Sequence, residues 1–436
     1  MIRLLLTLLL LTPAPAAAQL TAAERAAVAT VDRETERHVA LLERLVNQNS
    51  GTLNLAGVKA VADMLRPEFA TIGMEVRWID MAEAGRAGHL VATSRAQHRR
   101  GRPAPRHILL IGHLDTVFEP SSPFQRFERQ GGRATGPGIG DDKGGIVVIL
   151  AALRALKAAR LLQDVDVTVV LTGDEERIGA PLAIARRDLI AAGRVADYAL
   201  EFENLARDAG RDFGTVARRS SANWTLTTRG QTGHSSGIFT PGQGYGAIYE
   251  MSRILDAFRR ELPEPNLTYN VGVLAGGTPA ALDPTEEGAT AAGKTNIIAQ
   301  SAVARGDIRT LSPEQDARVR ERMQAIVAQH LPRTSAELVF GDAAYPPMAP
   351  TPGNRALLTR LNEVNRALGF PEMAEYDPAR RGAADSAFVA ADVDTLGGLG
   401  IAGGGAHAEG EWVDLTSLPL QAKRAALLMH RLSTRR

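Results

Sequence analysis

The order of apolar and polar positions predicts a protein in which helices alternate with buried strands. Residues 21–47 and 54–73 carry apolar side chains at the spacing of one helix face. Residues 107–112 and 165–171 are short apolar runs, and a helical stretch at residues 145–160 lies between them. Such runs are typical of strands buried on both sides, so we expect an α/β sheet with helices on both faces.

The pattern changes near Gly214, and the length of the chain favours more than one core. A chain of 436 residues is longer than a single ordinary domain. Between residues 215 and 331, predicted strands and two predicted helices form a compact α+β unit. We therefore predict an inserted domain at residues 215–331, flanked by two parts of a larger domain at residues 19–214 and 332–436.

The first 18 residues have the pattern of a secretory signal peptide. Arg3 precedes an apolar run at residues 4–11, and an alanine-rich stretch follows that ends at Ala18. The apolar run is too short to remain as a membrane-spanning helix. We expect cleavage near Ala18 and export of the mature chain, most simply to a bacterial periplasm, without a membrane anchor.

The composition narrows the chemistry further. The formal net charge is only +1, so nothing indicates the clustered basic surface of a nucleic-acid-binding protein. The chain has no cysteine, which excludes disulfide bonds and a lipid-bearing cysteine. Any metal site must therefore use histidine, aspartate and glutamate side chains.

Residues with metal-binding chemistry follow the first buried strand. His113 and Asp115 stand at its end, and a glycine-rich loop at residues 136–145 presents Asp141. A histidine followed by a carboxylate suits a metal ligand whose ring is oriented by the acidic group. Ligands of α/β sheets collect beyond the carboxyl ends of the strands, which is where these residues are expected.

Further acids and a second histidine lie at similar positions. Glu175 and Glu176 follow the second buried strand, and His407 lies in a glycine-rich loop near the end of the chain. Glu201 and Glu203 end a later strand, and alternation places both on the same face, so the pattern leaves both open as ligands. Nitrogen and oxygen donors without a thiolate describe a site for two zinc ions, or for cobalt or manganese.

The order of seven short motifs strongly resembles that of one enzyme family. The motifs are HLDTV, GPGIGDDKGG, DEE, DYALEFE, GQTGHSSG, TNII and GGGAHAEGEWVD. They are similar to those of the co-catalytic zinc exopeptidases, which include aminoacylase, succinyl-diaminopimelate desuccinylase and, as the nearest pattern, bacterial glutamate carboxypeptidase. The resemblance covers essentially the whole mature chain. It implies a mixed sheet sandwiched by helices, with the inserted domain acting as a dimerisation lid.

The resemblance also implies a role for each residue of the metal site. Two zinc ions would share the ligands His113, Asp141, Glu176, Glu203 and His407. Asp141 would bridge the two ions, and Glu201 is the less favoured alternative to Glu203. Glu175 would be the general base that activates the zinc-bound water, and Asp115 would orient the first histidine.

Further positions carried over from the family concern the substrate. His234, in the inserted domain, would reach the active site of the partner subunit in a homodimer and stabilise the tetrahedral oxyanion. Asn296 and Arg309 would hold the terminal carboxylate of the substrate. Arg381 and Gly382 belong to the glycine-rich substrate loop of the family.

These roles predict a metal-dependent exopeptidase that hydrolyses the amide bond to a C-terminal amino acid. Glutamate or aspartate is expected if Arg380 and Arg381 point into the site. An aminoacylase or dipeptidase on the same two-zinc scaffold is the alternative, and a non-catalytic periplasmic peptide-binding protein is a more remote one. A nucleotide enzyme is not favoured, because residues 136–140 do not form a G-x-G-x-x-G motif that opens a helix.

Overall fold

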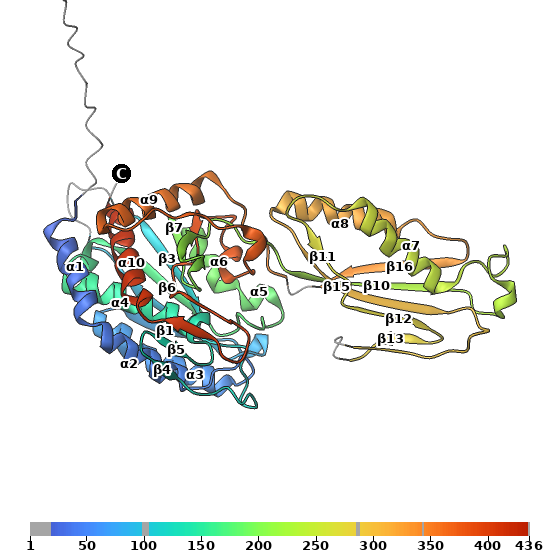
Figure 1. Cartoon of the computed structure of the whole chain (residues 1–436), viewed down its shortest axis with the longest axis horizontal. Helices are drawn as coiled ribbons and strands as arrows, with labels where there is room; N and C mark the ends of the chain where they lie inside the picture. Colours follow the sequence, from blue (N-terminus) through green and yellow to red (C-terminus); the bar gives the residue numbers. More distant parts are fainter. Residues whose placement is uncertain (1–18, 98–103, 285–287, 342–343, 435–436) are drawn as a thin grey trace, which may run out of the picture.

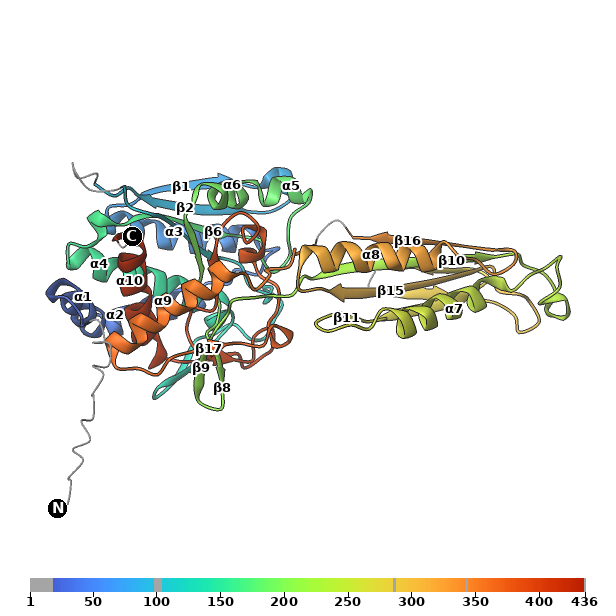
Figure 2. The same ribbon diagram turned by 90° about the horizontal axis from the view of Figure 1, so that it is seen from above.

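The computed structural model consists of a rounded larger body and an elongated smaller one (Figures 1 and 2). It describes residues 19–97, 104–284, 288–341 and 344–434. The predicted signal peptide at residues 1–18 lies outside the described residues. Within the described ranges, no helix has both the length and the apolar character that crossing a membrane requires.

A six-stranded mixed sheet forms the centre of the larger body, with the strand order β1-β2-β6-β3-β7-β18. Strands β6, β3, β7 and β18 run parallel, whereas β2 is antiparallel to both β1 and β6. This arrangement confirms the predicted fold class. The strands are β1 (Glu75–Asp80), β2 (Gly88–Ser94), β3 (His107–His113), β6 (Asp166–Thr172), β7 (Tyr198–Glu201) and β18 (Thr395–Leu396).

Helices cover both faces of this sheet. Ile108 and Leu110 of β3 pack in one buried cluster with α1, α4 and α10, whereas Leu109 and Ile111 pack in a second cluster with α6. Alternate residues of a strand point to opposite faces, so a strand covered on both sides is apolar at every position. The helices are α1 (Ala22–Arg33), α2 (Thr35–Val46), α3 (Leu55–Ile72), α4 (Gly145–Ala158), α5 (Leu182–Ala185), α6 (Arg187–Val195), α9 (Pro352–Leu368) and α10 (Ser417–Thr434).

The first helix is shorter than the sequence pattern predicted. Residues 21–47 form two helices, α1 and α2, which meet at Glu34, where the backbone leaves helical geometry with φ −99° and ψ 7°. The Glu34 carboxylate accepts a hydrogen bond from Arg154 of α4 at 2.9 Å. A tertiary contact marks the break, which the periodicity of the segment alone does not reveal.

A four-stranded sheet brings a C-terminal loop beside the glycine-rich loop, in the order β19-β20-β5-β4. Strand β5 leads directly into the glycine-rich loop, and the turn between β19 and β20 carries His407. Two distant parts of the sequence therefore meet here. The strands are β4 (Glu128–Gln130), β5 (Arg133–Thr135), β19 (Gly403–Gly404) and β20 (Trp412–Asp414); a separate sheet contains β8 (Ala206–Asp208), β9 (Arg211–Gly214) and β17 (Ala374–Glu375).

The smaller body is a sheet in the order β11-β15-β10-β16, with β12 also paired to β15 and the helices α7 and α8 on one face (Figure 2). Trp224, Phe258 and Met323 are at the centre of its own core. Its elements are β10 (Ala222–Gly230), α7 (Gly246–Glu261), β11 (Thr268–Tyr269), β12 (Val273–Gly277), β13 (Ala280–Leu282), β14 (Ala289–Ala291), β15 (Ser301–Arg309), α8 (Pro313–Val327) and β16 (Thr334–Phe340).

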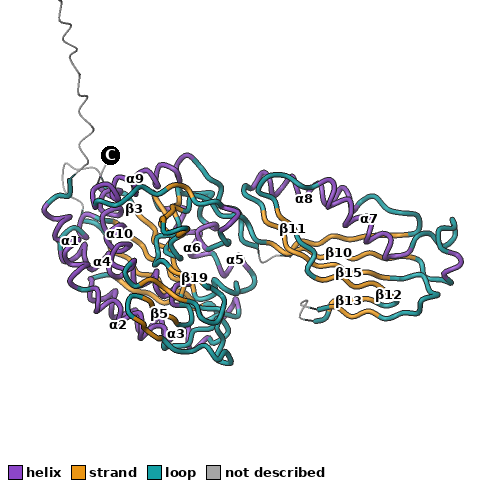
Figure 3. The backbone as a smooth tube through the Cα atoms, viewed as in Figure 1, coloured by secondary structure: helices purple, strands orange, loops and turns teal. Residues whose placement is uncertain are grey.

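Strand β16 corrects the boundary expected at residue 331. It pairs with β10 along its whole length, so it belongs to the smaller sheet although the sequence boundary assigned it to the larger domain. Loops make both connections between the bodies (Figure 3). These loops pair with each other through bridges from Arg218 to Met348 and from Ser221 to Tyr345.

Candidate metal centre and substrate pocket

The carboxyl ends of three neighbouring strands define one edge of the central sheet. Strand β3 ends at His113, β6 ends at Thr172 and β7 ends at Glu201. Because the three strands are parallel, the segments that follow them reach the same edge. These segments carry Glu175 and Glu203.

Asp141 lies between two histidines at this edge. Its Oδ1 is 3.0 Å from Nε2 of His113, and its Oδ2 is 3.3 Å from Nε2 of His407. The same nitrogen of His407 is 3.0 Å from Oε2 of Glu176. A carboxylate that directs one oxygen toward each histidine has the placement of a ligand shared by two ions.

Two groups of donor atoms are compact enough to hold cations. The candidate ligand atoms of His113, Asp141 and Glu176 lie within 4.8 Å of one another, and so do those of His113, Glu175 and Glu203. Oε1 of Glu176 is buried and has no hydrogen-bond partner among the described residues. A buried orphan oxygen calls for a partner such as a cation. The residues present therefore fit a centre for zinc, cobalt or manganese.

Burial concentrates negative charge at this site, and the pKa values reflect it. Burial raises the pKa of Glu175 well above its usual value and the pKa of Glu203 to about 8. Burial alone would also raise the pKa of Asp141, but hydrogen bonds with His113 and His407 outweigh it and lower that pKa. Hydrogen bonds to Asp141 and Glu176 raise the pKa of His407 to about 11. Carboxylates crowded in this way are stabilised by a bound cation.

Asp115 organises two segments of the site. Its Oδ1 lies 3.4 Å from Nδ1 of His113, whose ring is also 3.1 Å from the backbone oxygen of Asp115. Its carboxylate accepts hydrogen bonds from the backbone N–H groups of Glu175 at 3.0 Å and Glu176 at 3.1 Å. The hydroxyl of Thr52 donates a further bond at 2.7 Å. Asp115 thus contacts His113, the residue it is expected to orient, and also fixes the backbone of the two glutamates.

The structure separates Glu201 from Glu203. Glu201 is 1% exposed, and its carboxylate accepts hydrogen bonds from Arg218 at 2.6 Å and from the N–H of Gly398 at 3.0 Å. Glu203 instead lines the pocket beside Glu175. Of the two glutamates, Glu203 is therefore the one placed among the candidate ligands.

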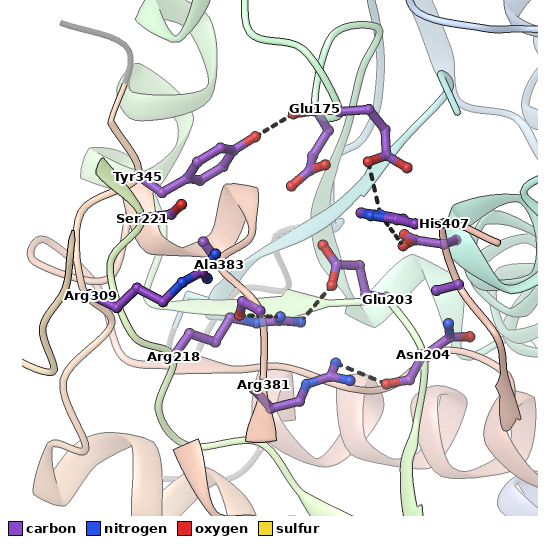
Figure 4. Close-up of a pocket in the computed structure, with 14 residues that line it drawn as sticks. Glu175, Glu203, Asn204, Arg218, Ser221, Arg309, Tyr345, Arg381, Ala383 and His407 are labelled. Atoms are coloured by element: carbon purple, nitrogen blue, oxygen red, sulfur yellow. Dashed lines mark hydrogen bonds and ion pairs between the residues drawn. The ribbon is translucent and has the colours of Figure 1, made fainter. Parts of the chain in front are cut away.

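The pocket beside these residues has a volume of about 460 Å³ and is charged on two sides (Figure 4). The hydroxyl of Tyr345 donates a hydrogen bond to the backbone carbonyl of Glu175 at its edge. One side of the pocket is acidic and the other is basic. The acids are Asp141, Glu175, Glu176 and Glu203, and the basic residues are Arg218, Arg309 and Arg381.

Arg381 lines the pocket, whereas Arg380 does not. Arg381 donates to the backbone carbonyl of Asn204 at 2.9 Å, and within the described part of the chain its buried Nε has no hydrogen-bond partner. Gly382 also lines the pocket, and its carbonyl accepts a hydrogen bond from Arg218 at 3.0 Å. Arg380 pairs with Asp208 at 2.8 Å on the surface, so only one of the two adjacent arginines faces the site.

In a single subunit, His234 and Asn296 do not reach this pocket. The N–H of Ser235 bonds to the carbonyl of Asn296 at 2.9 Å, so the two predicted residues lie together. They lie near the start of β15, and Arg309 is at its other end. At ~3.3 Å per residue, that strand is roughly 25 Å long. The separation of His234 and Asn296 from the pocket is a consequence of the elongated shape of the smaller body (Figure 1).

Some pocket residues were not found from the sequence. Arg218, Ser221 and Tyr345 belong to the loops that join the two bodies, where a single sequence shows no motif.

Glu411 lies inside the motif GGGAHAEGEWVD, and its carboxylate contacts the glycine-rich loop. An acid within a motif that also contains a candidate ligand was a usable signal.

Comparison with known proteins agrees with this fold and site. The sequence model of Peptidase family M20/M25/M40 matches residues 109–431. The match covers most of the chain: it includes the larger body from β3 onward and all of the smaller body. The chain belongs to this family of metallopeptidases.

Individual relatives extend the comparison. Carboxypeptidase G2 of Pseudomonas sp. (strain RS-16) is 27% identical over 398 residues, which cover 89% of this chain and 87% of that protein. Succinyl-diaminopimelate desuccinylase of Methylocella silvestris is 30% identical over 197 residues, which cover 42% of this chain and 49% of that protein. The crystal structure of aminopeptidase PepT from Bacillus cereus superposes with a TM-score of 0.67 at 19% identity, covering 91% of this chain and 98% of that one. That structure shows the shared fold.

Proposed function

We propose that the protein is a metal-dependent exopeptidase that hydrolyses the amide bond to a C-terminal amino acid, with glutamate or aspartate preferred. The observation that carries this proposal is the pocket in which Glu175 and the candidate ligands face three arginines. The similarity to carboxypeptidase G2 over most of both chains supports cleavage at the C-terminal end of the substrate.

The candidate ligands would hold two divalent ions, in the first place zinc, with cobalt or manganese as substitutes. His113 and Glu203 would bind one ion, Glu176 and His407 the other, and Asp141 both. When bound, such ions polarise a carbonyl oxygen and lower the pKa of water.

Glu175 would act as the general base and then as the general acid. It would take a proton from the attacking water while the oxygen of that water bonds to the carbonyl carbon, and it would return the proton to the amine nitrogen as the C–N bond breaks. Its burial beside other acids favours an exchangeable proton on this carboxyl group. Asp115 and Tyr345 form hydrogen bonds to the backbone of Glu175, so the main chain from which its carboxylate extends is held in place.

The arginines support recognition of an anionic substrate. Four acids and three arginines line the pocket, a formal charge of −1 when every carboxylate is ionised and His407 is neutral; two divalent ions would raise this formal charge to +3. Arg309 would hold the terminal carboxylate, and Arg381, whose Nε is without a partner among the described residues, would hold an acidic side chain.

We also propose a homodimer in which His234 and Asn296 act on the partner's pocket. Exposed apolar side chains on the smaller body, including Phe239 at 52% and Tyr249 at 50% exposure, support a contact there. Nδ1 of His234 accepts a hydrogen bond from the N–H of Ser236 at 3.2 Å. A neutral ring in this arrangement carries its proton on Nε2, where it could be donated to an oxyanion.

Export is proposed from the pattern of residues 1–18 alone. Expression of the full chain in a Gram-negative host, followed by mass spectrometry of the periplasmic fraction, is expected to find a mature chain that begins near Gln19. An uncleaved chain confined to the cytoplasm would contradict this proposal.

A substrate panel tests the proposed reaction. Dipeptides and N-acyl amino acids ending in Glu, Asp, Ala, Leu or Lys are incubated with the zinc-loaded and the chelated protein, and amine release is measured. Chelator-sensitive cleavage that favours Glu or Asp is the expected result. A preference for neutral residues would move the function to an aminoacylase or dipeptidase. A protein that binds two ions but cleaves none of these substrates would instead favour a non-catalytic peptide-binding protein.

A further inference from the structure

Glu411 lies against the loop that carries Asp141. Its side chain is buried, with 1% of the residue exposed. One carboxylate oxygen accepts hydrogen bonds from the N–H groups of Gly140 at 2.8 Å and Asp141 at 3.0 Å, and the other accepts from Gly138 at 3.0 Å. The backbone carbonyl of Glu411 also accepts from the N–H of Gly136 at 3.1 Å. One residue therefore satisfies four donors of the glycine-rich loop.

The same residue belongs to the hairpin that presents His407. This histidine lies four residues before Glu411 in the turn between β19 and β20, and its side chain is 57% exposed. Packing in a core therefore does not fix its ring. Strand β20 pairs with β5, and Glu411 continues this contact as far as Asp141. Glu411 thus connects Asp141, through hydrogen bonds to its loop, with His407, through the hairpin that the two residues share.

A carboxylate is the side chain suited to this position. Successive backbone N–H groups in a glycine-rich loop form a concave site for an anion, and hydrogen bonds to a charged acceptor are about twice as strong as neutral ones. Glutamine has the same shape, but its NH₂ group would face the N–H donors of the loop. Without these bonds, a carboxylate buried this deeply beside other acids would be costly.

We propose that Glu411 is a positioning residue of the metal centre. It holds the loop of Asp141 and the hairpin of His407 together, so that both can bind the same ion with Glu176. This inference rests on the proposed two-metal centre, and it adds the element that sets the geometry of one half of it.

The test compares Glu411→Gln with Glu409→Gln. Glu409 is exposed in the same turn, so its variant removes the same charge without touching the loop. Each apoprotein is titrated with Zn²⁺ in a calorimeter, and the visible spectrum of the protein saturated with Co²⁺ is recorded. We expect Glu411→Gln to weaken one of the two binding steps roughly 10–100-fold, as is typical when a residue that supports a ligand is lost. Its cobalt spectrum is expected to change, whereas Glu409→Gln matches the unchanged protein in both measurements.

Each outcome is informative. Unchanged affinities and an unchanged cobalt spectrum in Glu411→Gln would overturn the inference, even if the melting temperature falls, because a merely structural role moves only stability. If that variant does not fold, Glu411→Asp repeats the test, since it keeps the charge but is one methylene too short to reach all the donors. Failure of the unchanged protein to bind two ions would instead overturn the metal centre itself.

Discussion

Arg218 donates a hydrogen bond of 2.6 Å to Glu201, and both side chains are almost completely buried. The same terminal nitrogen lies 2.8 Å from Glu203. Arg218 therefore pairs with both glutamates. Glu201 also accepts a hydrogen bond from the N–H of Gly398 and is buried, whereas Glu203 lines the pocket, where it is available to a cation. The loops that join the two bodies supply this arginine, so the smaller body is connected directly to the candidate ligands.

The two glutamates are expected to respond differently to the same substitution. Glu203→Gln should lose bound metal, because an amide is a poor ligand, and activity should fall with it. Glu201→Gln should keep two ions per subunit but destabilise the fold by about 2 kcal/mol, because the buried Arg218 loses one of its two carboxylate partners. Metal analysis and urea unfolding measure the two effects. Loss of metal in Glu201→Gln with none in Glu203→Gln would reverse the assignment.

Replacement of Glu175 by alanine separates catalysis from metal binding. We expect turnover to fall by at least ~100-fold, because the proton transfer to the amine loses its carrier. Two ions should remain bound, since His113, Asp141, Glu176, Glu203 and His407 are unchanged. Steady-state kinetics together with metal analysis provide the measurement. Substantial residual activity in a variant with full metal content would contradict the role of Glu175.

Arg381 and Arg380 form a matched pair for testing substrate preference. Arg381→Ala should raise KM for substrates ending in Glu or Asp by roughly 10–100-fold, the cost of a charge-assisted hydrogen bond, and change little for those ending in Ala or Leu. Arg380→Ala is the control, because Arg380 pairs with Asp208 outside the pocket. Equal effects of Arg381→Ala on acidic and neutral substrates would show that Arg381 does not recognise the side chain of the C-terminal residue.

Hybrid dimers test the proposal that the protein is a homodimer in which His234 acts across the interface. Glu175→Ala and His234→Ala chains are mixed in equal amounts under conditions that allow subunits to exchange. Half of the dimers are then hybrids, and one of the two sites in each hybrid has both an intact Glu175 and a partner with an intact His234. We expect about a quarter of the unmutated activity to return. A mixture as inactive as the separate variants would argue against action in trans.

The buried His38 of α2 predicts a pH dependence of stability. Burial lowers its pKa from 6.5 to about 4, and neither ring nitrogen has a hydrogen-bond partner among the described residues. The folded state therefore binds fewer protons than the unfolded state between these pH values, and stability falls as the pH drops from 6.5 to 4.

The variant His38→Leu isolates this effect. The difference in unfolding free energy between it and the unchanged protein should shift by about 2–3 kcal/mol in favour of the variant as the pH falls from 7 to 4. Urea unfolding of both apoproteins at several pH values gives this difference, in which the titration of other groups cancels. A difference that does not vary with pH would show that His38 is not buried in its neutral form.

Much of the central fold was predictable because its signals are local. A strand covered on both faces must be apolar at every position, so β3 and β6 could be recognised from their residues alone. The types of the candidate ligands were also predictable, because strand ends and a glycine-rich loop present them at the edge where α/β sheets bind ligands. The motif order then identified the family, and the family match confirmed it.

Other features could not be read from local patterns. The periodicity of residues 21–47 did not reveal the break at Glu34, and the boundary at residue 331 excluded β16 from the sheet it completes. Each of these features lies at a contact with a distant part of the sequence, Arg154 in one case and β10 in the other.

The sequence by itself determined the sheet, the kinds of ligand and the family, while the tertiary structure decided which side chains meet. Alternation placed Glu201 and Glu203 on one face, but β7 ends at Glu201, so the rule does not extend to Glu203. Arg218 and Gly398 then hold Glu201 in place. The spacing of side chains along one segment follows from backbone geometry, whereas contacts between segments follow from how the whole chain packs.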